Sequence, residues 1–155
     1  MYEIMTGAIF EEDPKSFPSK IAQLNTKGYP GKVHELYGSM RSSKIALPTS
    51  RPDFRLPDIT DAYLIDYVKA CHDNGLIFNY TMNANFIGNL EDISNKYEDI
   101  VNALKFLENE VKVDRITVAH PILLDIVCKH TSIPIEVSTV LNVNSLQAPR
   151  ELKKR

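Results

Sequence analysis

Amide and hydroxyl side chains follow the β-rich runs of this sequence, at the points where each run gives way to a loop. Such groups bind polar ligands and stabilise developing charge by hydrogen bonding. The residues expected to bind substrate there are Tyr37, Asn79, Asn83, Asn85, Thr139, Asn142 and Asn144. For any one asparagine a structural role competes, because Asn tolerates turns and bonds its own backbone. Taken together, the set is poor in carboxylates and predicts a polar substrate rim without an obvious acid–base pair.

His120 and Ser138 are the candidates for catalytic roles. His120 follows a β-rich run and directly precedes Pro121. An unperturbed imidazole pKa of about 6.5 suits a general acid or base. The alternative is a histidine that caps the following helix or points to water. Ser138 can act as a nucleophile only with a base within reach, and the sequence shows none.

Arg51 is the most informative charged residue because it lies in a long segment, 39–60, that contains prolines and no helical period. Loops of this length without structure of their own are usually functional or disordered. A guanidinium group binds a carboxylate or phosphate with two hydrogen bonds. The alternative is a salt bridge from Arg51 to Asp53 or Asp58.

The cysteines do not indicate a metal site. Cys71 falls on the apolar stripe of an expected helix, and Cys128 follows Ile126 and Val127, so both are expected to behave as small buried hydrophobes. They are far apart and form no C-x-x-C pair. The sequence also lacks a Gly-rich phosphate loop and a G-x-S-x-G elbow. We expect no metal and no cofactor within this chain.

Composition excludes several partner classes. The formal net charge of −2 is ordinary and gives no electrostatic case for nucleic acid or an anionic membrane. The one basic cluster, 150–155, reads as a solvated chain end. Residues 1–5 lack the features of a secretory leader, and no stretch approaches the roughly 18 apolar residues of a membrane helix. With two cysteines, too few for a disulfide framework, we expect a cytoplasmic protein.

These side chains are positioned by alternating strands and helices. Period-two and β-rich runs predict strands at 2–5, 32–37, 76–81, 114–119 and 134–139. Apolar stripes predict helices from Pro18 to before Gly28, over 61–74, over 91–110, from Pro121, and after Ser145. Thr60 is expected to cap the second helix and Gly75 to end it.

This order indicates parallel βαβ units with right-handed connections in one α/β domain, residues 1–155. An eight-unit barrel needs about 250 residues, so this sequence of 155 would supply the first five strands only. A five-stranded doubly wound sheet is the self-sufficient alternative. Composition and periodicity do not choose between them.

Four segments carry a resemblance to a known family. They are 34–38 (HELYG), 50–54 with 56–57 (SRPDF, LP), 78–84 (FNYTMNA) and 136–139 with 142–145 (EVST, NVNS). In this order and spacing they resemble the N-terminal half of the U32 peptidases, over about 2–145. The family pattern has a YG strand end, a GRP-x-F loop, an FNY-x-x-NA strand and an STxxNVNS strand end. This sequence has Thr49 and Ser50 where the family more often has glycine, and it ends where the family's second half would start.

The resemblance implies a TIM-type (β/α) barrel, here a partial barrel, with its site at the C-terminal strand ends. It implies a hydrolase, nominally a protease, acting on a peptide or another polar substrate. An alternative within the family is an iron–sulfur-dependent hydroxylation factor for an RNA base or quinone precursor, its cysteines supplied by a C-terminal half. A third reading is a non-catalytic partner-binding subunit or a truncated fragment. Since five strands leave an open edge and an exposed apolar interior, we expect a partner half or a homo-oligomer.

Overall fold

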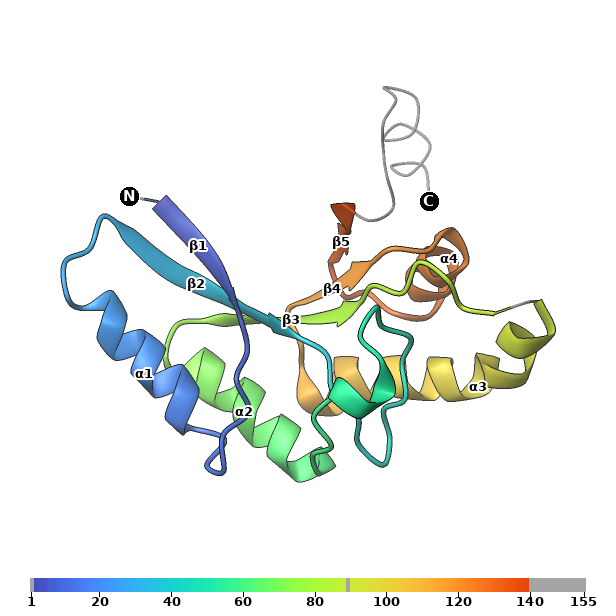
Figure 1. The fold of residues 1–155 in the computed structure, drawn as a ribbon, viewed down its shortest axis with the longest axis horizontal. Coiled ribbons are helices and arrows are strands. Elements are labelled where there is room, and N and C mark those ends of the chain that lie inside the picture. Colours follow the sequence, from blue (N-terminus) through green and yellow to red (C-terminus); the bar gives the residue numbers. More distant parts are fainter. Residues whose placement is uncertain (1, 89, 140–155) are drawn as a thin grey trace, which may run out of the picture.

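Five parallel strands form one curled sheet in the order β1-β2-β3-β4-β5 (Figure 1). The computed structural model describes residues 2–88 and 90–139. The strands are β1 (Tyr2–Gly7), β2 (Gly31–Gly38), β3 (Ile77–Met82), β4 (Arg115–Val118) and β5 (Ile135–Val137). The helices are α1 (Ser16–Asn25), α2 (Asp61–Asp73), α3 (Leu90–Phe106) and α4 (Pro121–His130), with a 3-10 turn at Asp53–Arg55 and a π turn at Leu107–Val111.

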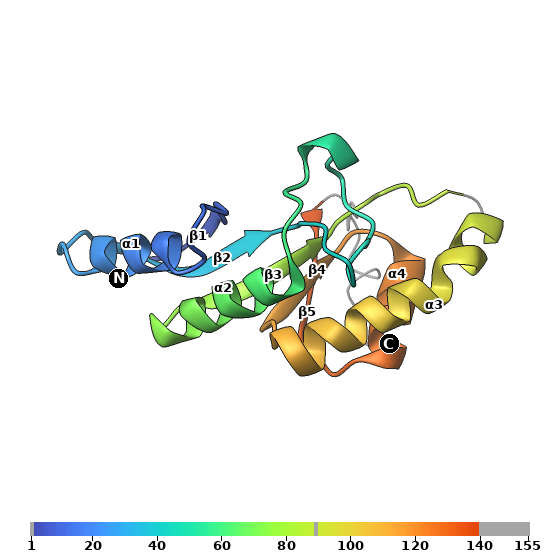
Figure 2. The same ribbon diagram turned by 90° about the horizontal axis from the view of Figure 1, so that it is seen from below.

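The strand order decides between the two predicted architectures. A doubly wound sheet reverses its strand order at a switch point, whereas here each strand pairs with the next one along the chain. Figures 1 and 2 show the strands twisting progressively from β1 to β5, with α1, α2 and α3 along one side of the sheet. The protein is therefore a partial (β/α) barrel, and the doubly wound alternative is wrong.

The helix-capping residues in the sequence predict the ends of α2 correctly. The amide of Tyr63 donates to the Thr60 side-chain oxygen at 3.1 Å, so Thr60 caps the helix as expected. Gly75 follows the helix with φ of +69°, a conformation that L side chains rarely adopt. Elsewhere in the described residues the predicted strands and helices are present with ends shifted by a few residues, as is usual for frayed termini. The helix predicted after Ser145 lies outside the described residues.

Replacing Thr60 with alanine is expected to lower the free energy of unfolding by about 1 kcal/mol, because the Tyr63 amide loses its acceptor. Thr60→Ser keeps the oxygen and should stay within about 0.5 kcal/mol of the wild type. Urea unfolding followed by circular dichroism measures both. Equal losses for the two variants would show that the capping bond does not stabilise α2.

The two faces of the sheet differ in chemistry because side chains alternate along each strand. Leu36, Phe78, Tyr80, Ile116 and Val118 are at most 1% exposed and belong to the apolar core. The intervening positions of β2 to β5 carry polar and charged residues on the opposite, inner face. Within residues 2–88 and 90–139, no helix has the length and hydropathy to cross a bilayer.

The two cysteines lie in different environments. Cys71 is buried in α2, as expected, and burial raises its thiol pKa to about 12. Cys128 is exposed, so the expectation of a buried Cys128 is wrong. In α4 the buried positions are Leu123, Leu124, Ile126 and Val127, and the next residue turns about 100° further round the helix, onto its outer side.

Iodoacetamide at pH 8 is expected to alkylate Cys128 and leave Cys71 unmodified in the native protein. A thiol with a pKa of about 12 carries almost no thiolate at that pH, and it is also shielded from the reagent. Mass spectrometry of the intact protein should show one adduct without urea and two with it. Two adducts under native conditions would mean that α2 opens readily.

Candidate functional site

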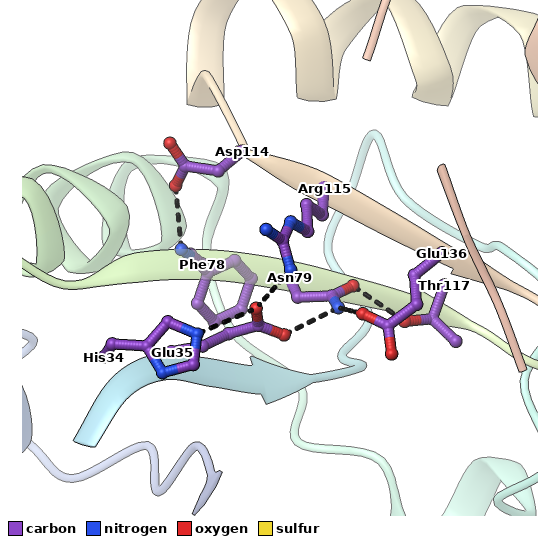
Figure 3. A network of polar contacts seen from close by, with 8 residues as sticks. All are labelled: His34, Glu35, Phe78, Asn79, Asp114, Arg115, Thr117 and Glu136. Carbon is purple, nitrogen blue, oxygen red and sulfur yellow. Dashed lines mark hydrogen bonds and ion pairs between the residues drawn. The ribbon is translucent and has the colours of Figure 1, made fainter. Parts of the chain in front are cut away.

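A chain of hydrogen bonds crosses the inner face from β2 to β5 (Figure 3). The Asn79 side-chain amide donates to Glu35 Oε1 at 2.8 Å and to Glu136 Oε2 at 3.1 Å. Its carbonyl oxygen accepts from the Thr117 hydroxyl at 2.9 Å. Arg115 Nη1 lies 3.1 Å from Glu35 Oε2. These five residues, here called the inner-face network, come from four adjacent strands.

The side chains of the network differ in burial, from those at its closed side to those at its open side. The Glu35 side chain is 0% exposed, whereas the Arg115 side chain is 42% exposed. Asn79 is 2% exposed, and Thr117 and Glu136 are half-buried. Glu35 is therefore held by hydrogen bonds within the protein, because a buried carboxylate without such partners is strongly unfavourable. Arg115 and Glu136 remain able to contact a ligand on the inner face.

The network combines two carboxylates, a guanidinium group, an amide and a hydroxyl within one surface. Asn79 uses its donor group on two acids at once, which keeps the like charges bridged rather than directly opposed. A guanidinium donates and a carboxylate accepts, so together they match the alternating acceptors and donors of a peptide backbone or another polar chain. The arrangement can therefore bind and orient a polar ligand.

Asn83 fixes the long loop at the carboxyl ends of the strands. Its Oδ1 accepts from the Ser50 amide at 3.1 Å, the Ser50 hydroxyl at 3.1 Å and the Thr49 hydroxyl at 3.2 Å. The Thr49 hydroxyl also lies 3.0 Å from that of Ser39, which directly follows β2. The loop is thus tied to both β2 and β3, and Asn83 acts through the loop rather than as an isolated rim group.

Asn83→Ala is expected to speed trypsin cleavage after Arg55 several-fold, because three hydrogen bonds to residues 49–50 are lost together. Asn85→Ala is the matched control, since Asn85 is exposed and has no hydrogen bond to the described part of the chain. Gel electrophoresis and mass spectrometry of a timed digest follow both variants. Identical digestion of Asn83→Ala and wild type would contradict the anchoring role.

The other predicted substrate residues lie in several environments. Tyr37 is 38% exposed on β2, and Asn85 and Thr139 are exposed beyond β3 and β5. Arg51 is exposed, and its amide donates to the Thr49 hydroxyl at 3.4 Å. Its suggested partner Asp53 instead lies 3.8 Å from Arg41. Asn142 and Asn144 lie outside the described residues.

His120 and Ser138 lie at the carboxyl ends of neighbouring strands. His120 Nδ1 accepts from the Ile122 amide at 3.2 Å and caps α4. This contact leaves Nε2 as the nitrogen that could exchange a proton. The Ser138 amide donates to the Val118 carbonyl at 2.8 Å, which continues the pairing of β5 with β4. Because side chains alternate, Ser138 shares the inner face with Glu136.

Sequence reasoning missed Glu35, Arg115, Thr117 and Glu136. It assigned Asn79 to a substrate rim at the end of the strand predicted at 76–81, whereas Asn79 is the third residue of β3 and is buried on the inner face. The alternation of side chains along a strand could have identified the others. Residues separated by an even number of positions on one strand have their side chains on the same face. The predicted site also seemed poor in acids only because Glu35 and Glu136 were counted as strand residues.

An iron–sulfur cluster does not fit the cysteines of the described chain. Cys71 is buried in α2 with a pKa raised by desolvation, and Cys128 is exposed on α4. In residues 2–88 and 90–139 no three metal-binding side chains lie together. A cluster would therefore require ligands from elsewhere, and no step of the chemistry is assigned to one.

Comparison with known proteins supports the architecture. No protein-family model and no curated protein matches this sequence. The solved structure of the U32 peptidase Mk0906 superposes on the chain with a TM-score of 0.67 at 16% identity. The match covers 99% of this chain and 55% of that protein, so the chain spans about half of its length. At this identity the likeness shows the fold, a partial barrel of the kind found in U32 peptidases.

Proposed function

We propose that this chain supplies the substrate-binding inner face of a U32-like barrel hydrolase that acts on a peptide or another polar substrate. The observation that carries the proposal is the inner-face network. Buried Glu35 and Asn79 hold Arg115 and Glu136 in place, and the outer two side chains stay accessible. The similarity in fold to a U32 peptidase is consistent with this class.

In this proposal Arg115 donates to a carbonyl or carboxylate of the substrate, and Glu136 accepts from an N–H group. Ser138 directly follows β5, two residues beyond Glu136, where its hydroxyl would attack the bound carbonyl. His120 Nε2, beyond the end of β4, is the proposed base for that hydroxyl and then protonates the leaving amine as the C–N bond breaks. Water hydrolyses the resulting acyl-enzyme and releases the second product. Tyr37, Arg51, Asn83, Asn85 and Thr139, with Asn142 and Asn144, are proposed to border the substrate.

A complementary half is part of the proposal. β1 and β5 are the terminal strands of the described sheet, and β1 exposes Tyr2, Ile4 and Met5 at 77%, 45% and 45%. Unpaired strand edges with apolar side chains favour pairing with further strands. A partner half or a second copy would enclose the inner face and exclude water from the site.

The proposal is tested by incubating the chain with a pool of defined hexapeptides and identifying new peptide termini by mass spectrometry. Glu136→Gln keeps an oxygen that can accept from Asn79 but removes the charge. It should lower the rate of product formation at least tenfold. Glu98→Gln, exposed on α3, is the matched control and should behave as wild type. Equal rates for Glu136→Gln and wild type would contradict the proposal. So would a chain that produces no new termini and also binds none of the peptides.

A further inference from the structure

A cavity lies outside the inner face, between the β2–α2 loop, the β3–α3 loop and α3. Its volume is about 590 Å³, within the range of about 300–1,000 Å³ typical of small-molecule sites. None of the inner-face network residues lines it. It is here called the side cavity.

The floor of the side cavity is apolar and its border is charged. The apolar lining residues include Leu47, Leu56, Ile93, Ile100 and Leu123, each at most 9% exposed. The charged lining residues are Arg41, Asp53, Asp92, Lys96 and Asp99. A ligand that fits must bury apolar groups and present charge at its ends.

Arg41 has an unused donor at this border. Its backbone is fixed, since its amide donates to the Pro57 carbonyl at 2.9 Å and its carbonyl accepts from the Ile59 amide at 3.0 Å. Its Nη1 lies a loose 3.8 Å from Asp53 Oδ2. Its Nε is shielded from solvent and has no hydrogen-bond partner. Buried donors without an acceptor are uncommon in folded proteins. The Arg41 side chain as a whole is 40% exposed, so its terminal guanidinium nitrogens can donate to a ligand carboxylate.

The balance of charge favours a zwitterion over a simple anion. Two cations and three carboxylates line the cavity, so an anion alone would meet a net negative border. On α3, Lys96 and Asp99 make no ion pair or hydrogen bond with the described residues, and both can serve a ligand. A carboxylate can lie against Arg41 and Lys96 while an ammonium group lies against Asp99.

We propose that the side cavity binds a short zwitterionic peptide of two or three apolar residues. Its volume suits such a ligand better than a single amino acid. A peptide carries its carboxylate and its ammonium group at opposite ends, so the two can contact Arg41 in the β2–α2 loop and Asp99 on α3. The site is independent of the proposed hydrolase chemistry, because it shares no residue with the inner-face network.

Isothermal titration calorimetry of the full chain with trileucine tests the proposal. Saturable binding is expected, and both N-acetyl-trileucine and trileucine amide should bind roughly tenfold more weakly, since each lacks one charge. Arg41→Gln and Asp99→Asn should each weaken trileucine binding roughly tenfold. Arg55→Gln, in the same loop, and Glu98→Gln, on the same helix, are matched controls that should bind as wild type, because neither residue lines the side cavity. Arg41→Lys, which retains the charge but lacks Nε, replaces Arg41→Gln if the latter does not fold.

Glu136→Gln separates this proposal from the proposed function, because it should lose peptide turnover and bind trileucine as wild type does. No saturable trileucine binding, or equal binding of the capped peptides, would overturn the side-cavity proposal. So would a loss of trileucine binding in Glu136→Gln, which would place the ligand on the inner face.

Discussion

Asn79→Asp is expected to lower the free energy of unfolding at neutral pH by about 3–5 kcal/mol. The substitution conserves shape but replaces the NH₂ group that donates to Glu35 and Glu136 with an oxygen, so that a third carboxylate faces the other two. Since Asn79 is 2% exposed, water cannot take over its role. Chemical denaturation at pH 7 measures the loss. Of the single substitutions considered, this one has the largest expected effect on stability.

Two further variants make the result specific. Asn85→Asp adds the same charge at an exposed position and should change stability by less than about 0.5 kcal/mol. Adding Glu136→Gln to Asn79→Asp restores a donor opposite the new carboxylate and should recover part of the loss. Crowded carboxylates have raised pKa values in the folded state, so the stability deficit of Asn79→Asp should shrink as the pH falls. A loss equal to that of Asn85→Asp would mean that the network does not hold the inner face.

The exposed face of β1 is expected to govern association. Replacing Ile4 and Met5 together with lysine should weaken self-association at least tenfold, because charges on an edge strand block pairing with another sheet. Both residues are 45% exposed on the terminal strand of the sheet. Sedimentation velocity over a range of concentrations measures the effect.

Leu24→Lys is the matched control for this experiment. Leu24 is a similarly exposed apolar residue, at 40%, but it lies on α1, away from the sheet edge. The control should associate as wild type does. A wild-type chain that is monomeric at all concentrations would show that the β1 edge attracts no partner strand, and the complementary half would lose its support.

The parts of the fold that were predictable from sequence depend on neighbours along the chain. The Thr60 cap requires only the amide of Tyr63, three residues away, and Gly75 requires only its own backbone conformation. The alternation of strands and helices was read in the same way. Composition and periodicity could not choose between a barrel and a doubly wound sheet, because strand order depends on pairing between distant segments. The resemblance to the U32 peptidases implied the partial barrel, and the strand order confirms it.

The same distinction explains the site. Asn79 was predicted to contact substrate from its residue type, but its bonds to Glu35 and Glu136 depend on the register of β2, β3 and β5. Those acids looked like ordinary strand residues until the strands were paired. Cys128 was misjudged for a related reason, since its apolar neighbours in sequence face the core while it turns outward.

The central claim is that the inner face binds a polar chain through its network, and the side-chain amide of Asn79 reports this most directly. Proton–nitrogen correlation spectra, recorded while pentaglycine is added, follow that amide and the side-chain amide of Asn109 together. Asn109 is exposed after α3, and its amide donates to the Lys105 carbonyl at 2.9 Å. We expect the Asn79 signal to shift saturably and the Asn109 signal to stay in place, because Asn79 bonds Glu136 at the open face. An Asn79 signal that remains fixed up to the solubility limit of pentaglycine would contradict the claim.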